Sequence, residues 1–154
     1  MKEHRFSMIL SLGICIASAA LLAVWLFTFP AFFNWFYFGY HHLLPSAGPQ
    51  AAVQNVVRCF YCCAPFAAAA LGMLIALLLN LLKGRVFIPR NVSFLRWVSW
   101  CCWAVCAIAF GFGFLYMPLM IVSFAMGVVG TLLRVVKNVM HAAVALQEEN
   151  SLTV

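Results

Sequence analysis

Acidic residues are almost absent from this chain of 154 residues. It has three, all of them Glu and all near the two ends, at Glu3, Glu148 and Glu149. Proton-coupled pumps generally need an ionisable group within the membrane, and carboxylate-based hydrolases need positioned carboxylates. The sequence also has no Ser-His-Asp set, HExxH motif or glycine-rich phosphate loop. We therefore expect a protein that is not an enzyme and that uses no metal or other cofactor.

Charged residues of either sign are also few. They make up 8% of the chain, whereas hydrophobic residues make up 67%. A soluble domain has about 25% charged and about 45–50% apolar residues, so a bilayer accounts for this composition and a water-soluble core does not. Four apolar runs approach the roughly 20 residues that a spanning helix needs, at about 7–29, 60–82, 95–116 and 119–136. We predict an all-α membrane protein, one integral membrane domain over residues 1–154 with four transmembrane helices in an antiparallel bundle.

The Lys and Arg residues that are present fall almost entirely on one side of these runs. Only Arg58 lies on the other side. The remaining eight are Lys2, Arg5, Lys83, Arg85, Arg90, Arg96, Arg134 and Lys137. Because short loops rich in Lys and Arg stay in the cytosol, both termini and an inner basic loop at 83–94 are predicted to be cytosolic. The net charge of +6 is mostly this topological signal, so we expect contact with the lipid bilayer and no direct nucleic-acid binding.

The connection between the first two runs, residues 30–57, is the only long one. We predict that Pro30 ends the first span and that a densely aromatic segment follows at the outer membrane surface. The candidate residues of this outer interface are Trp35, Tyr37, Tyr40, His41 and His42. This segment supports an alternative function, a binder of a small lipophilic ligand or peptide, such as an immunity or export-accessory protein.

The fourth run continues as an amphipathic cytosolic tail over residues 134–154. Polar residues recur on one face and apolar residues on the other, at helical spacing. Such a helix can lie on lipid, pack against the basic loop or receive a partner helix.

The seven cysteines lie mostly within the apolar runs and do not form a secreted disulfide framework. Cys59 and Cys62 lie one helical turn apart beside Arg58, a cation that lowers a thiol pKa. A membrane thiol oxidoreductase is therefore a further alternative. It would also need a second dithiol or a quinone site on the same side, and the other cysteines do not supply one. Packing is the favoured role, because cysteine behaves as a small apolar residue within membrane helices.

Small residues recur at four-residue spacing, which lets helix backbones approach closely in lipid. The pairs are Gly13 and Ala17, Ala68 and Gly72, Ala107 and Gly111, and Ser123 and Gly127. They favour packing within one chain, with a homo-oligomer as the alternative.

Three short motifs and the tail resemble one family of small bacterial membrane proteins. The motifs are Pro65-Phe66, Leu82-Lys83-Gly84-Arg85-Val86-Phe87 and Asn91-Val92-Ser93-Phe94-Leu95-Arg96, and the tail is 143–154. The family is catalogued as domain of unknown function 2975, and the resemblance covers roughly residues 58–154. Ser151 stands where the family usually has Asp.

The resemblance implies four spans with cytosolic termini in the bacterial cytoplasmic (inner) membrane. Members often lie next to a small helix-turn-helix transcription factor. By that analogy the chain is expected to be a membrane-bound regulator of a cytosolic DNA-binding partner.

The basic loop and the tail supply the surface on which such a partner could dock. The candidate docking residues are Phe87, Arg90, Arg96, Gln147, Glu148, Glu149, Asn150, Leu152 and Thr153. The alternative is that the polar tail residues only solubilise the end of the last helix.

Overall fold

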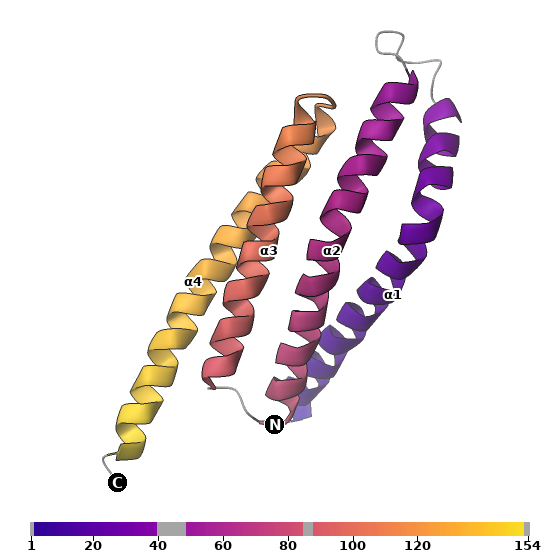
Figure 1. Ribbon diagram of the computed structural model, residues 1–154. Helices are drawn as coiled ribbons and strands as arrows, with labels where there is room; N and C mark the ends of the chain where they lie inside the picture. The colour runs from indigo at the N-terminus through magenta and orange to yellow at the C-terminus, as the bar shows by residue number, and fades with distance from the viewer. Residues whose placement is uncertain (1, 40–48, 85–87, 153–154) are drawn as a thin grey trace.

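The structure, a computed structural model, describes residues 2–39, 49–84 and 88–152 and contains four long helices (Figure 1). They are α1 (Lys2–Gly39), α2 (Pro49–Leu82), α3 (Pro89–Gly113) and α4 (Pro118–Leu152). Each helix is long and apolar enough to cross a membrane, over Ser7–Trp35, Val53–Leu82, Pro89–Gly113 and Pro118–Leu146. The described residues contain no strand. The prediction of an all-α protein with four helices of membrane-spanning length is confirmed.

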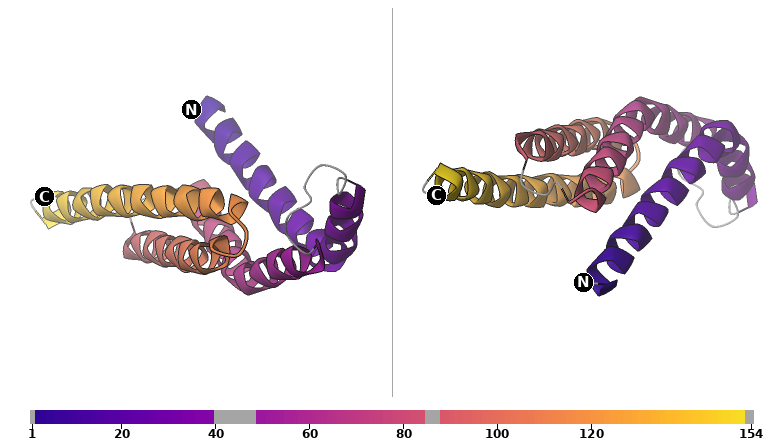
Figure 2. Two further views of the ribbon diagram at one scale, coloured as in Figure 1. Left: turned by 90° about the horizontal axis from the view of Figure 1, so that it is seen from above. Right: turned by 90° about the horizontal axis from the view of Figure 1, so that it is seen from below.

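The predicted loop at 30–57 was wrong in extent, because α1 continues through Pro30 to Gly39 and α2 already begins at Pro49. Proline removes one N–H donor and bends a helix, but an apolar environment favours keeping the remaining helical hydrogen bonds. Figures 1 and 2 show that α1 bends along its length, as a helix with an internal proline does.

The basic loop is also shorter than predicted, because α3 begins at Pro89 and not at residue 95. Proline suits the first turn of a helix, where its missing N–H needs no partner. At the preceding helix end, Gly84 adopts a left-handed φ of 73° and its N–H donates to the Leu81 carbonyl at 2.9 Å. A glycine in this conformation is a common helix stop. α3 ends at Gly113, three residues before the predicted end at 116.

The helices pack in chain order. α1 contacts α2, α2 contacts α3, and the most extensive packing is between α3 and α4. Figures 1 and 2 show α1 diverging from α4, and Figure 1 shows the start of α1 and the end of α4 at the same end of the molecule, hereafter the termini end. Since α3 lies between two neighbours, 39% of its most apolar 18-residue stretch is buried, against none of the corresponding stretch of α1.

Hydrogen bonds between helices reinforce the packing of α2, α3 and α4. The Asn80 Nδ2 atom of α2 donates to the Asn91 Oδ1 atom of α3 at 3.1 Å. Between α3 and α4, the buried Ser99 hydroxyl donates to the Gly130 carbonyl at 2.8 Å and the Ser123 hydroxyl donates to the Cys106 carbonyl at 2.9 Å. In an apolar environment such bonds hold helices together, because an unpaired polar group there is costly.

Candidate functional site

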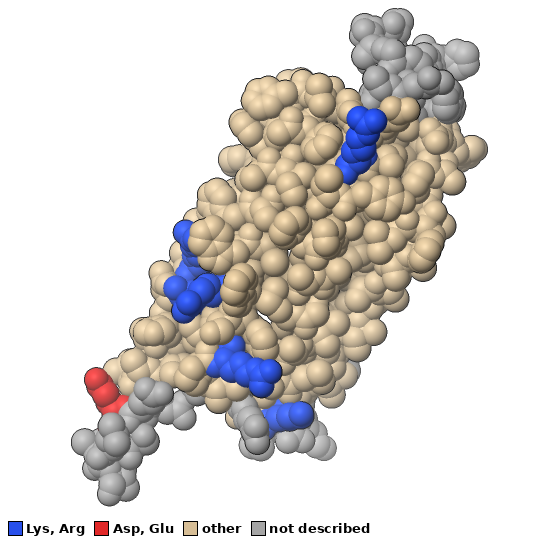
Figure 3. Space-filling view, viewed as in Figure 1, with Lys and Arg blue, Asp and Glu red and all other residues tan. Residues whose placement is uncertain are grey.

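The first candidate site is a cationic and aromatic surface near the termini end of α3 and α4. Figure 3 shows Lys and Arg side chains gathered over the lower half of the molecule, with a separate cation near the opposite end. Arg96 and Trp100 lie four residues apart on one face of α3. The Arg134 Cζ atom of α4 lies 4.9 Å from the centroid of the Trp100 ring, which is cation–π distance. The guanidinium of Arg134 is therefore held over Trp100.

Next to these residues lies a groove between α2 and α3. It has a volume of about 430 Å³ and is lined by Phe66, Arg96, Trp97, Trp100, Cys101 and Ala104. Arg96 is its only charged lining residue among those described. The groove therefore combines an apolar wall with one positive charge.

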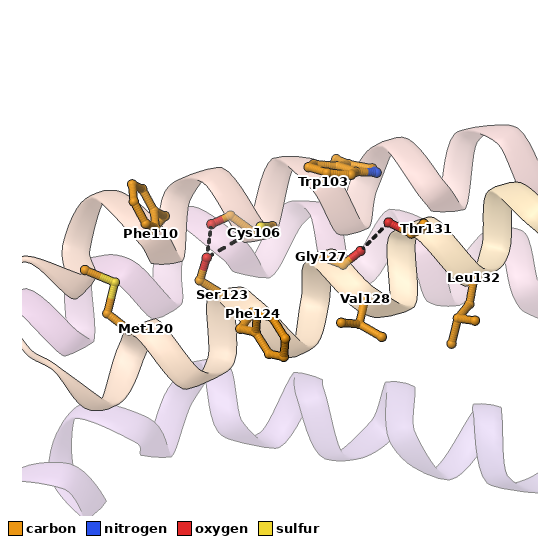
Figure 4. A pocket seen from close by; sticks show the side chains of 10 residues that line it. All are labelled: Trp103, Cys106, Phe110, Met120, Ser123, Phe124, Gly127, Val128, Thr131 and Leu132. Carbon is orange, nitrogen blue, oxygen red and sulfur yellow. Dashed lines mark hydrogen bonds between the residues drawn. The ribbon is translucent and has the colours of Figure 1, made fainter.

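A second groove, between α3 and α4, is almost wholly apolar (Figure 4). It has a volume of about 630 Å³. Its lining residues are Trp103, Cys106, Phe110, Met120, Ser123, Phe124, Gly127, Val128, Thr131 and Leu132. The Ser123 hydroxyl is bonded to the Cys106 carbonyl, and the Thr131 hydroxyl donates to the Gly127 carbonyl at 2.9 Å. Because both hydroxyls already have partners, the groove suits a hydrocarbon chain better than a polar ligand.

The part of α1 just before Pro30 packs against aromatic residues of α2 at the end opposite the termini. The Phe29 and Phe60 rings stack with their centroids 4.1 Å apart, and the Tyr61 hydroxyl donates to the Leu26 carbonyl at 2.7 Å. Trp35 lies farther along the helix and is 75% exposed. Tyr37 is in the helix, but its side chain lies outside the described residues, as do Tyr40, His41 and His42 altogether. Only Trp35 of the predicted outer interface can therefore be placed as a side chain.

The cysteines form no disulfide, since all seven are free. Cys59 is buried and Cys62 is exposed, so the two thiols of the predicted redox pair occupy different environments. Within the described part of the chain, no three His, Cys, Asp or Glu residues come close enough to hold a metal ion.

The predicted docking residues divide between the start of α3 and the end of α4. Arg90 and Arg96 are exposed on α3, where the Arg90 Cζ atom lies 5.6 Å from the Phe94 ring centroid. Glu149 is exposed on α4. The remaining predicted docking residues are either helical with side chains outside the description (Gln147, Glu148, Asn150 and Leu152) or wholly outside it (Phe87 and Thr153).

The tail carries a stripe of exposed apolar residues. The spacing of apolar residues in the sequence predicted the stripe but not its exposure. Val135, Val139 and Leu146 are 55%, 65% and 61% exposed, whereas Val144 is 8% exposed. Val144 lies on the side of the helix away from this stripe, so the tail turns Val144 toward the protein and the stripe away from it. Spacing alone identifies the apolar stripe, but it does not reveal which side of the helix a neighbour covers.

A known protein family matches most of the chain. The model of the family described as "Protein of unknown function (DUF2975)" matches residues 31–154. This match begins well before residue 58, so it includes the aromatic segment, which lay outside the predicted resemblance over roughly residues 58–154. A search of curated proteins and a search of solved structures found no match. Four apolar helices and this match together identify the chain as a multi-pass membrane protein that belongs to the DUF2975 family.

Proposed function

We propose that this protein is a non-catalytic regulator in the bacterial cytoplasmic membrane that binds a cytosolic DNA-binding protein through the tail of α4. Its four helices cross the membrane as an antiparallel bundle with both termini in the cytosol. The distribution of charge supports this topology, because eight of the nine Lys and Arg residues fall on the side of the termini.

The observation that carries the proposal is the length of α4. It is one continuous helix of 35 residues, which corresponds to about 50 Å at about 1.5 Å per residue. The hydrocarbon core of a bilayer is only about 30 Å thick, so the helix must project well beyond it. The projecting part begins near Arg134 and Lys137 and continues to Leu152.

The exposed stripe on this projection supports partner binding. Val139 and Leu146 lie seven residues apart, on one face of the helix, and both are more than half exposed. Amphipathic helices bind partner helices through apolar residues at this spacing. His141 is also exposed and lies between these two residues in the sequence, so it is a suitable position for a polar control substitution.

The test is affinity purification from native membranes of the intact protein and of the double variant Val139→Asn, Leu146→Asn. We expect a helix-turn-helix protein to accompany the intact chain and to be reduced at least tenfold with the double variant. His141→Gln is the control, and it should retain the partner. A version ending at Leu146 tests the final residues separately. If no DNA-binding protein accompanies the intact chain, or if the double variant retains it fully, the proposal fails.

A second candidate function is the binding of a small lipophilic ligand or peptide. It is favoured by the apolar α3–α4 groove of about 630 Å³. Val128→Trp would fill this groove, whereas Trp35→Ala changes only the aromatic segment of α1. Loss of binding of a fluorescent lipophilic probe with the first variant alone would assign the ligand to the groove. Loss with the second alone would assign it to the aromatic segment, and unchanged binding with both would exclude this function.

A further inference from the structure

Two grooves follow one another along the boundary between α2 and α3. The groove that contains Arg96 ends at Ala104, and a second groove of about 640 Å³ continues past it. The second groove is lined by Cys62, Phe66, Ala107, Ile108, Gly111, Phe112 and Leu115. Phe66 lines both grooves, so they are adjacent, and together they are hereafter called the α2–α3 seam.

The seam has the dimensions of a lipid chain. The helix from Arg96 to Gly111 is about 22 Å long at about 1.5 Å per residue. Half of a hydrocarbon core of about 30 Å is about 15 Å. An acyl chain that starts at the level of Arg96 therefore has an apolar wall beside it as far as the middle of the bilayer.

The end of the seam nearest the termini has the charge and the aromatic residues of a headgroup site. Arg96 lines the seam, and Arg134 lies over Trp100, which also lines it. Trp97 and Trp100 are 62% and 54% exposed, and tryptophan rings favour the headgroup level of a membrane. Among the described side chains the only carboxylate is that of Glu149, and neither arginine forms an ion pair there.

From this combination we infer that the α2–α3 seam binds one anionic phospholipid from the leaflet at the termini end. Its phosphate lies at Arg96 and Arg134, and one acyl chain follows Trp97, Ala104 and Gly111. A partner helix from another protein would fill the apolar seam but would not need two cations and two tryptophans at one end of it. The inference concerns a surface separate from the α4 tail and does not depend on the proposed regulatory function.

The test is native mass spectrometry of the purified protein in micelles with equal amounts of phosphatidylglycerol and phosphatidylcholine. We expect one phosphatidylglycerol to be retained in preference to phosphatidylcholine. Arg96→Gln should lower its retention about fivefold, the factor expected for one cation near an anionic headgroup. Arg58→Gln is the matched control. It also removes an exposed cation, but one in the half of α2 that lies away from the termini end, so it should leave the retention of phosphatidylglycerol unchanged.

A second variant tests the acyl-chain part of the seam. A Cβ atom at Gly111 would meet no atom within 4 Å, so Gly111→Leu fills the seam without displacing a helix. It should reduce the retention of both lipids. Equal retention of the two lipids by the unmodified protein, equal losses with Arg96→Gln and Arg58→Gln, or unchanged retention with Gly111→Leu would each overturn the inference. Displacement of the lipid by inorganic phosphate alone would also overturn it, since the site would then bind the anion and not the lipid.

Discussion

The α3–α4 pair and the α1–α2 pair are both built from apolar helices, yet they pack in different ways. Between α3 and α4, two serine hydroxyls donate to backbone carbonyls, and Gly113, Gly127 and Gly130 come close to the facing helix. Between α1 and α2, the contacts include a stacked pair of phenylalanine rings and one tyrosine hydrogen bond. Lipid tails are as apolar as leucine, so hydrophobicity alone does not join helices in a membrane. The comparison indicates that close backbone approach and buried polar bonds make α3–α4 the more firmly packed pair.

The largest loss of stability is expected from a substitution that blocks the close approach of α3 and α4. A Cβ atom at Gly130 would lie 3.1 Å from the Trp103 Cδ1 atom and 3.3 Å from the Cys102 Cβ atom. Gly130→Leu should therefore push α3 and α4 apart and lower the free energy of unfolding by about 2 kcal/mol. SDS-induced unfolding in mixed micelles measures this change. Gly72→Leu is the control, because a Cβ atom there meets nothing within 4 Å, and equal losses in the two variants would contradict the comparison.

A smaller loss of stability is expected from a substitution that removes only a hydrogen bond between helices. Ser99→Ala deletes the donor to the Gly130 carbonyl at a buried position and should cost about 1 kcal/mol. Ser11→Ala is the matched control, since the exposed Ser11 hydroxyl donates to the Ser7 carbonyl within its own helix. The same unfolding measurement applies. If Ser11→Ala destabilises the protein as much as Ser99→Ala, the interhelical bond is not what holds α3 to α4.

The smallest effect is expected in the α1–α2 pair. Tyr61→Phe removes the hydroxyl that donates to the Leu26 carbonyl but keeps the ring, so the loss should be about 0.5 kcal/mol. Spin labels on α1 and α2 should show a broader distance distribution, while the distance between labels on α3 and α4 stays unchanged. Tyr116→Phe is the control, because no hydrogen bond of its hydroxyl to a described residue is found. Broadening in α3–α4 as well would show that the two pairs are not independent.

The sequence predicted the centres of the spans but not their ends. Hydropathy is a property of each local run, so all four helices were expected at the right places in the chain. Their boundaries depend on prolines. Pro30 lies within α1, whereas Pro49 and Pro89 begin α2 and α3. A proline shows that one N–H is missing, but only the surroundings decide whether the helix bends, begins or ends there.

The candidate sites were predictable only in part. Arg96 and Arg134 were recognisable as residues at the membrane boundary from charge alone. That Arg96 lines a groove with Phe66, and that Arg134 lies over Trp100, required the packing of α2, α3 and α4. In the tail, the period of apolar residues predicted a helix, but the burial of Val144 and the exposure of Val139 depend on what lies beside it.

The sequence by itself thus determined that the chain is helical, where its four apolar helices lie and on which side the cations gather, because each of these depends on neighbours along the chain. The tertiary structure decided that the helices pack in chain order, that Ser99 and Ser123 bond across α3 and α4, and that a seam runs between α2 and α3. These features join residues that are distant in the sequence. Apolar helices have many alternative faces of similar hydrophobicity, and only shape and hydrogen bonding select among them.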